Sequence, residues 1–505
     1  MLFNSGRFVL IFLPVMLTVF FIFGKLGWRR AAIAWLVAAS TFFYGWFSVR
    51  YLAMLAVLIL VNFWLGQRLA RDFRNGKQRP YLVACGIAIN LGVLGYFKYA
   101  NFFIGNVNAA FGTAYVLQNI ILPIGISFFT FQKIAYLVDA YRGDAEGYEL
   151  LEFSLFVMFF PQLIAGPIVH HKEIIPQFRR SDLRLSFRDL AAGISLFVIG
   201  MVKKVLIADT VSDWANAAFS ATKAGGPLSF FDAWSGALSF ALQIYFDFSG
   251  YTDMALGLAL MVGIRLPLNF NSPYKAHNII DFWRRWHMTL SRFLRDYVYI
   301  PLGGNRRGRA RRYLNLMLTM LLGGFWHGAA WTFVVWGGLH GAYLAINHAW
   351  QGGRGRLGWK LGFGPIGKLG GGLLTFLCVV IAWVFFRAEG FASAAAMLKA
   401  MAWSGDLGTV DARWVIIAAL LALVWFLPNS QQLLGEWRPV IDEIHPAKLP
   451  AMLRSAASRL GFASSAGTLA LTRSTGAIAG TLLFGLLVYQ AMRSTTLQPF
   501  IYFQF

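Results

Sequence analysis

The side chains best suited to acid–base chemistry in this sequence are two histidines in apolar surroundings. His327 lies between Trp326 and Gly328 in the nearly apolar run 313–331, and His287 ends a Trp-Arg-Arg-Trp-His segment. At the rise of an α-helix, residues 313–326 span roughly 21 Å, so His327 should lie well inside a hydrocarbon layer about 30 Å thick. Because lipid offers an ionisable group no compensation, this depth indicates a function. A hydrogen-bonded histidine that joins two helices is the structural alternative.

Histidine gains and loses a proton near neutral pH, so His327 is a candidate general base for activating a hydroxyl, which is a weak nucleophile. The role of His287 stays open: it could orient the base, hold the acceptor or stabilise a developing oxyanion. Asp247 and Asp253 lie in the segment FDFSGYTD. A buried Asp costs about 2.5–3.5 kcal/mol at the bilayer centre, so both should face the protein interior or a polar cavity. We expect Asp253 to be structural, near a helix start, and Asp247 to cap a helix or bind substrate.

Other glycine, proline and histidine residues are expected to have structural roles. The Gly323-Gly324 pair should loosen its helix and allow another backbone to approach closely. Pro161, Gly166 and Pro167 should break the apolar segment 151–168, which we expect to be re-entrant and covered by protein. The remaining histidines of interest are expected to be solvated at an interface (His170 and His171), or packed or interfacial (His340 and His348).

The composition identifies a membrane protein. Of 505 residues, 58% are hydrophobic and 13% are charged, and the mean hydropathy is +0.58. These values are typical of polytopic proteins and exclude an ordinary soluble enzyme. The net charge of +23 is better explained by cytoplasmic loops and anionic headgroups than by nucleic-acid binding. Two cysteines, Cys85 and Cys378, both in apolar runs, support neither a disulfide framework nor a thiolate metal site. We predict no metal site and no bound cofactor.

Apolar segments recur along the chain, so we predict an all-α polytopic protein with one membrane domain over residues 1–505. It should have roughly 11–14 membrane segments, including re-entrant and interfacial helices, around a central tunnel. The candidate spans are 8–24, 31–47, 52–69, 81–97, 120–141, 151–168, 190–208, 230–246, 254–264, 313–325, 330–346, 373–386, 415–427 and 478–489. The first is expected to be a retained span, since it has no basic leader and no convincing cleavage site.

Basic loops set the expected orientation, with the N-terminus and the C-terminus outside the cytoplasm. The loops predicted to be cytoplasmic are 25–30, 68–79, 172–188, 275–312, 354–368 and 428–474. The most basic, 275–312, holds ten Lys or Arg against two Asp. An amphipathic helix at about 278–297 is expected there, with Trp283 and His287 facing the membrane domain and Arg284 and Arg285 on its polar side.

Several motifs together carry a resemblance to a known family. They are PQLIAGPI, YFDFSGYTDMALGL, FWRRWHMTLSRFLRDYVYIPLGGNR, LTMLLGGFWHGAAW and the terminal PFIYFQF. In this order they closely resemble the membrane-bound O-acyltransferase family, in its bacterial polysaccharide branch, typified by alginate O-acetyltransferases. The resemblance implies that His327, in FWHG, is the catalytic histidine and that His287 is a second catalytic position. Trp283, Arg284, Arg285, Trp326 and Asp247 are the predicted substrate-binding residues.

The resemblance also implies a reaction and partners. An acetyl group would pass from acetyl-CoA or another cytoplasmic acyl thioester through the membrane, to O-acetylate an exopolysaccharide such as alginate or cellulose. A periplasmic acetyl-carrying or transferase protein would receive it, in the inner membrane of a bacterium and in contact with membrane lipids but no nucleic acid. Acylation of peptidoglycan, teichoic acid or lipid is the alternative within the family. A proton-coupled transporter is the alternative of another class, which the absence of an inverted repeat disfavours.

Overall fold

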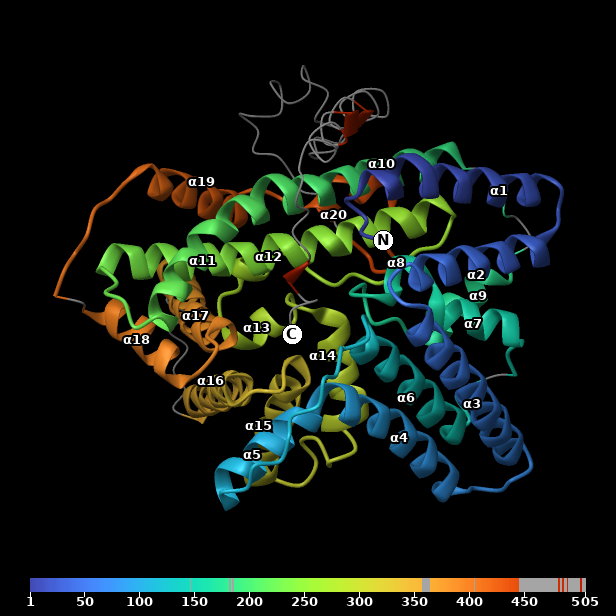
Figure 1. The fold of residues 1–505 in the computed structure, drawn as a ribbon, viewed down its shortest axis with the longest axis horizontal. Coiled ribbons are helices and arrows are strands. Elements are labelled where there is room, and N and C mark those ends of the chain that lie inside the picture. Colours follow the sequence, from blue (N-terminus) through green and yellow to red (C-terminus); the bar gives the residue numbers. More distant parts are fainter. Residues whose placement is uncertain are drawn as a thin grey trace. The chain divides into compact units, whose positions relative to one another are not determined.

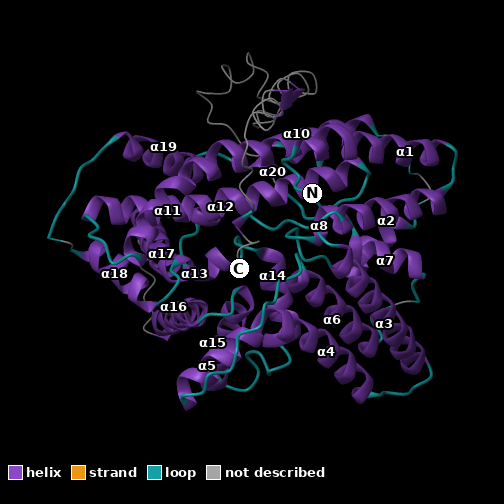
Figure 2. Ribbon diagram, in the orientation of Figure 1, coloured by secondary structure: helices purple, strands orange, loops and turns teal. Residues whose placement is uncertain are grey.

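The computed structural model describes residues 1–145, 147–180, 183, 186–356, 364–403 and 405–444, together with 480, 481, 484, 485, 488, 500 and 501. All regular elements in these residues are helical (Figure 2). The predicted all-α class is therefore confirmed. Much of the predicted loop 428–474, and most of the predicted span 478–489, lie outside the described residues.

The described chain divides into two compact units, each built from separate stretches of sequence. The first takes Met1–Val202, Gly250–Leu268 and Ser430–Phe503. Its helices are η1 (Phe8–Phe12), α1 (Leu13–Lys25), α2 (Arg29–Gly45), α3 (Val49–Arg74), α4 (Pro80–Leu94), η2 (Gly95–Tyr99), α5 (Ala100–Phe111), α6 (Ile126–Arg142), α7 (Leu150–Met158), α8 (Phe160–Leu163), α9 (His171–Phe178), α10 (Phe187–Met201), α20 (Ser430–Leu433) and η6 (Gly435–Trp437). The α-helices are labelled in Figure 1.

The second unit takes Lys203–Ser249 and Asn269–Asn429. Its helices are η3 (Val202–Ala208), α11 (Asp209–Lys223), η4 (Pro273–Lys275), α13 (Ile279–Trp283), α14 (Met288–Leu294), η5 (Arg295–Tyr299), α15 (Arg309–His327), α16 (Trp331–Arg356), α17 (Gly364–Arg387), α18 (Phe391–Ala402) and α19 (Ala412–Phe426). Helix α12 (Phe230–Met261) contributes to both units. The units do not follow one another along the sequence, and the single domain over 1–505 stays a prediction.

Among the described residues, five helical stretches are long and apolar enough to cross a membrane. They are Phe8–Lys25, Val49–Arg74, Pro80–Phe111, Phe187–Lys223 and Gly364–Arg387. The protein is thus a multi-pass membrane protein, and the predicted first span is a helix.

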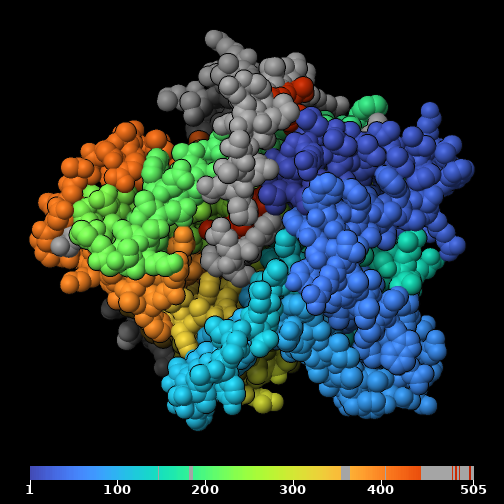
Figure 3. Space-filling view, in the orientation of Figure 1, coloured from blue at the N-terminus to red at the C-terminus, as the bar shows by residue number. Residues whose placement is uncertain are grey.

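The N-terminal helices α1 to α4 expose large apolar side chains. These helices are the blue surface of Figure 3. Only 17% of the most apolar window of Pro80–Phe111 is buried within the protein. Exposed apolar residues on these helices include Val15, Ile22, Phe42, Val57, Leu60, Trp64 and Tyr81. Since so much apolar surface is unfavourable in water, it fits a lipid-facing wall.

The predicted break in segment 151–168 is present. Helix α7 ends at Met158, the four-residue α8 follows, and the chain then runs without a helix until His171. Gly166 is required where it stands, because a Cβ there would lie 2.4 Å from the Cα of Gln162. The Gln162 side chain donates to the carbonyl of Phe156 at 2.6 Å, which satisfies a group released by the break. Most of this segment is buried, as expected for irregular backbone covered by protein.

The two predicted spans 230–246 and 254–264 are wrong as separate helices, because α12 is continuous over 32 residues. The polar residues between them do not interrupt it. Asp247 and Asp253 are buried inside the helix and pair with side chains on other elements. A buried carboxylate with such partners needs no break in the backbone.

The close approach predicted at Gly323-Gly324 occurs between α15 and α16. A Cβ on Gly324 would lie 2.3 Å from the carbonyl oxygen of Phe333, and one on Gly337 would lie 2.3 Å from that of Met320. Only glycine allows two helix backbones to meet this closely. The crossing lies three residues before His327 and therefore sets where that side chain is presented.

Candidate active site

His327 is the last residue of α15 and is 4% exposed. Three aromatic rings surround its imidazole, with centroids 5.0 Å away for Trp326, 5.2 Å for Trp336 and 5.3 Å for Phe386. These rings come from α15, α16 and α17. The result is an imidazole held in an apolar aromatic cage.

His287 is fully buried at a sharp bend between α13 and α14. The single helix expected at about 278–297 is therefore wrong. The φ of His287 is +42°, in the left-handed region. For a residue other than glycine this conformation costs about 1–2 kcal/mol, and it persists only where the surroundings impose it.

The segment before the bend imposes it through backbone hydrogen bonds from residues 269 and 271. The N–H of Asn271 donates to the carbonyl of Arg285 at 2.9 Å, and the N–H of Met288 donates to the carbonyl of Asn269 at 3.0 Å. The apolar stripe predicted for that helix is largely kept despite the bend: Tyr297 is only partly buried, and the buried members are Trp283, Trp286, Leu290, Phe293 and Leu294.

Asn269 fixes the protonation pattern of His287. Its side-chain oxygen accepts from the backbone N–H of Thr289 at 3.3 Å and from the Thr289 hydroxyl at 2.9 Å, and it lies 3.1 Å from His287 Nδ1. Because a backbone N–H can only donate, the atom facing it must be the amide oxygen. His287 Nδ1 therefore carries a proton, and in the neutral ring Nε2 is left as the acceptor.

The structure brings the two predicted catalytic histidines together. The ring centroids of His287 and His327 are 6.3 Å apart. Phe248 of α12 packs edge-on against His287 at 4.8 Å. Sequence reasoning missed Asn269 and Phe248, and the available signal was the amide of Asn269 between two apolar residues, Leu268 and Phe270.

The predicted substrate-binding residues fall in different surroundings. Trp326 contacts both histidine rings, at 5.0 Å from His327 and 6.3 Å from His287. Trp283 is 9% exposed and donates from Nε1 to His340 Nδ1 at 3.2 Å. It packs against Trp336, one of the rings around His327. Arg284 is exposed, as expected for the polar side.

Arg285 is partly buried and held by two protein groups. Its Nε lies 2.8 Å from Asp281 Oδ1, and its terminal nitrogen donates to the carbonyl of Asn271 at 3.3 Å. Binding a donor phosphate would have to compete with these contacts. Arg284 is thus the better placed of the two arginines.

Asp247 pairs with a buried lysine. Its Oδ1 lies 2.6 Å from Lys204 Nζ, which also lies 2.7 Å from Asp209 Oδ1. Lys204 and Asp247 are each about 2–3% exposed. The pair joins η3 to α12 one residue before Phe248, so it supports the wall behind His287. Direct contact between Asp247 and substrate stays a prediction.

The structural role predicted for Asp253 fits its contacts, but its predicted place near a helix start is wrong. Asp253 lies inside α12 and accepts from the Ser430 hydroxyl at 2.6 Å and from the Gln431 side-chain amide. It therefore ties α12 to α20 within the first unit.

The other histidines only partly follow prediction. His340 is fully buried and packed, as expected, and His348 Nδ1 accepts from Arg312 at 2.7 Å. His171 is not solvated: it is fully buried, and its neighbour His170 has a side chain only 25% exposed. Burial lowers the pKa of His171 despite the opposing hydrogen bond with Asp139.

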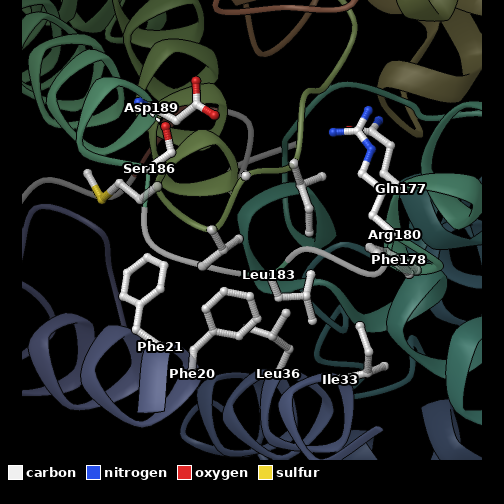
Figure 4. Close-up of a pocket in the computed structure, with 14 residues that line it drawn as sticks. Phe20, Phe21, Ile33, Leu36, Gln177, Phe178, Arg180, Leu183, Ser186 and Asp189 are labelled. Carbon is white, nitrogen blue, oxygen red and sulfur yellow. Dashed lines mark hydrogen bonds between the residues drawn. The ribbon is translucent and has the colours of Figure 1, made fainter. Parts of the chain in front are cut away.

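A cavity of about 170 Å³ lies in the first unit, with Phe20, Phe21, Ile33 and Leu36 along one side and Arg180 and Asp189 at its rim (Figure 4). Neither His287 nor His327 lines it. The predicted tunnel past His287 and His327 stays a prediction.

These features define a class: a multi-pass helical membrane protein with two buried imidazoles facing one another in an aromatic cage. Comparison with known proteins identifies the family. The model of the membrane-bound O-acyltransferase family matches residues 10–353, and the chain belongs to that family. It is a membrane-bound O-acyltransferase of the acetyltransferase kind.

The names of similar proteins refer to different polymers. The chain is 43% identical over 428 residues to a peptidoglycan O-acetyltransferase of Helicobacter pylori, covering 79% of this chain and 80% of that protein. It is 44% identical over 407 residues to a probable alginate O-acetylase of Pseudomonas aeruginosa, covering 79% and 75%. It is 37% identical over 525 residues to a probable alginate O-acetylase of Azotobacter vinelandii, covering all of both chains.

Proposed function

We propose that this enzyme takes an acetyl group from a cytoplasmic acyl thioester, such as acetyl-CoA, and delivers it across the membrane for O-acetylation of an exopolysaccharide. The observation that carries the proposal is the buried pair of imidazoles, His287 and His327, 6.3 Å apart between ring centroids. At this spacing one hydroxyl group lying between the rings contacts both. Burying two ionisable side chains in a membrane protein costs free energy, so the pair supports a catalytic role rather than packing alone.

In the proposed reaction, His327 removes the proton from the acceptor hydroxyl as its oxygen attacks the thioester carbonyl. A tetrahedral intermediate forms. Its collapse breaks the carbon–sulfur bond, and the leaving thiolate takes the proton back from His327 to give the free thiol. The products are an O-acetyl ester and the thiol, and the imidazole returns to its starting state. The aromatic cage excludes water, which would otherwise hydrolyse the thioester.

The role proposed for His287 follows from its tautomer. Nδ1–H is directed at Asn269, so Nε2 presents a lone pair. A lone pair cannot donate a hydrogen bond to an oxyanion, which disfavours that role for the neutral ring. It can accept from the acceptor hydroxyl or from the protonated nitrogen of His327. We therefore assign His287 to orienting one of these groups.

The donor and the partners follow from charge and topology. The basic loop 275–312 would face the cytoplasm, where Arg284 would contact the phosphates of the donor. The enzyme would lie in the inner membrane of a bacterium, surrounded by lipids, and pass acetyl to a periplasmic carrier or transferase protein.

The choice of polymer rests on the relatives. Those named as alginate O-acetylases and the one named as a peptidoglycan O-acetyltransferase are similarly identical to this chain. The match to a probable alginate O-acetylase over the full length of both chains favours an exopolysaccharide such as alginate or cellulose. Acetylation of peptidoglycan is the alternative.

The central experiment replaces His327 by Ala in cells that express the full chain. Polymer acetylation should be lost while membrane insertion and monodispersity in detergent stay at wild-type levels. His277→Ala is the matched control, because that imidazole is exposed and outside the cage. Acetyl content measured on both the exopolysaccharide and the peptidoglycan identifies the polymer. Undiminished acetylation in the His327 variant would exclude it as the base.

A further inference from the structure

Two histidines and an aspartate in the first unit converge on one point, away from any role in the reaction above. Asp139 lies near the end of α6, His170 caps the start of α9 and His171 begins it. Asp139 Oδ2 is 2.6 Å from His170 Nε2 and 3.0 Å from His171 Nε2. The three potential ligand atoms all lie within 4.8 Å of one another.

We propose that Asp139, His170 and His171 form a binding site for a transition-metal ion such as Zn²⁺. We predicted no metal site from the sequence, in which Asp139 and the two histidines lie on separate segments. Two imidazole nitrogens and one carboxylate oxygen are a donor set that suits Zn²⁺ and related ions, whereas Ca²⁺ and Mg²⁺ prefer oxygen donors. Three protein ligands with water as the fourth make a tetrahedral site.

The surroundings orient the ligands. Tyr148 places its hydroxyl 2.8 Å from His171 Nδ1, and an outer hydrogen bond of this kind is typical of a metal-binding histidine. His171 is fully buried, while the His170 side chain is 25% exposed, which leaves one side open for the ion and its water. The site is therefore buried on the side of His171 and accessible on the side of His170.

Metal binding would change the tautomers without a net loss of protons from neutral rings. Each Nε2 now lies within hydrogen-bonding distance of Asp139 Oδ2, to which a neutral ring donates its Nε2–H. With the ion present, each Nε2 would bind the metal and each Nδ1 would carry the proton. For His171 that proton would be donated to Tyr148. For His170 the change would break the hydrogen bonds that Nδ1 accepts from backbone N–H groups at the start of α9, the one from Lys172 at 3.3 Å and the one from Glu173. Coordination of the ion would have to offset the loss of these contacts.

Nearby charges are largely balanced. Lys172 Nζ pairs with Asp144 at 2.8 Å, and the Glu173 side chain accepts from the N–H of His170 at 3.2 Å. The N-terminus of α9 is unfavourable for a cation, but Asp139 and the C-terminal end of α6 oppose it. The ion would link α6 to α9, on either side of the irregular segment after α7.

The test uses the full chain, purified in detergent without a histidine tag and stripped with a chelator. Equilibrium dialysis against Zn²⁺ should give one bound ion per chain. Co²⁺ in place of Zn²⁺ should give the intense visible absorption of tetrahedral coordination. Added Zn²⁺ should also raise the unfolding temperature, since it binds only the folded site.

Asp139→Asn and His170→Gln should each abolish stoichiometric binding, the Co²⁺ absorption and the thermal shift. His170→Gln is the safer variant, because its side chain is partly exposed and glutamine keeps a polar group. His277→Gln, which changes an exposed histidine elsewhere, should behave as wild type. The proposal is overturned if the wild-type chain binds no stoichiometric ion, which would leave a hydrogen-bonded cluster only, or if His170→Gln binds Zn²⁺ as wild type does. None of these measurements depends on acetyl transfer.

Discussion

At the scale of single residues, Asn269 is the most informative finding, because it holds the ring of His287, one of the two predicted catalytic residues. Its side-chain oxygen accepts hydrogen bonds from the Nδ1–H of His287 and from the backbone N–H and hydroxyl of Thr289. Without that acceptor, the buried ring of His287 could turn over or change tautomer. A positioning residue of this kind affects rate more than substrate binding.

We predict that Asn269→Ala lowers kcat by about tenfold to a hundredfold with little change in KM. Asn269→Asp keeps an acceptor for Nδ1–H and should restore part of the rate. Its negative charge would raise the pKa of His287, so the acidic limb of the pH–rate profile should move to higher pH. Steady-state kinetics on purified variants measure both effects.

Asn271→Ala is the control for this prediction. It lies on the same segment, and its side-chain oxygen accepts from Asn429 rather than from a histidine. The kinetics of this variant should match wild type. Equal losses in the variants at 269 and 271, with no shift in the pH profile of Asn269→Asp, would reduce Asn269 to a structural residue.

The sequence predicted the histidines but not their supports. His327 and His287 could be identified because an ionisable side chain in an apolar run is conspicuous. Asn269 could not, because its importance depends on a bend at His287 that places residues 18 positions apart in contact. The left-handed φ of His287 has no sequence signal, since it is a conformation that histidine rarely adopts.

At the scale of elements, the sequence-based predictions were accurate where the residue types within a segment determine its backbone. The broken segment after α7 and the glycine contact of α15 follow from Pro and Gly, whose backbone effects are local. Helix α12 was predicted as two helices because Asp247 and Asp253 resemble a loop. Their partners, Lys204, Ser430 and Gln431, are distant in sequence, and only the fold brings them near.

The crossing of α15 and α16 gives an element-scale prediction with a neighbouring control. Gly337→Ala would place a Cβ 2.3 Å from the carbonyl of Met320, which forces the helices apart. We expect a loss of about 1–3 kcal/mol in stability and a lower kcat, because His327 follows the crossing. Gly338→Ala meets only Leu321 Cδ2 at 3.6 Å, an ordinary contact, and should be tolerated.

Thermal unfolding in detergent and acetyl transfer by equal amounts of folded protein measure the two effects. Helix propensity favours alanine over glycine at both positions, so it cannot explain a difference between them. Similar stability and activity in the two variants would mean that the crossing does not position His327.

At the scale of the whole molecule, the net charge of +23 predicts how the chain is oriented in the membrane. The positive loops predict that 275–312 is cytoplasmic and that the C-terminus is outside. Single cysteines at Arg307→Cys and Phe505→Cys, in a chain whose Cys85 and Cys378 are replaced by Ala, test this with an impermeant maleimide. The first should be labelled only in inverted vesicles and the second only in intact spheroplasts. Labelling of both from one side would refute the arrangement.

The proposed function places donor capture at the face that bears Arg284 and Arg285. Arg284 is exposed, whereas Arg285 is engaged with Asp281 and with the carbonyl of Asn271. We therefore predict that Arg284→Ala raises the KM for the thioester donor by about tenfold, the loss expected for one charged hydrogen bond, with kcat nearly unchanged.

Arg285→Ala should instead lower stability by about 1 kcal/mol or less, because its ion pair is only partly buried, and leave the donor KM close to wild type. The two neighbouring arginines thus separate donor binding from support of the bend that holds His287. Initial rates at varied donor concentration, with reconstituted variants at equal folded amounts, distinguish them. If lipid anchoring were the purpose of Arg284, its replacement would reduce insertion or thermal stability while the donor KM of the folded protein stayed at the wild-type value. That result would remove Arg284 from the donor entrance.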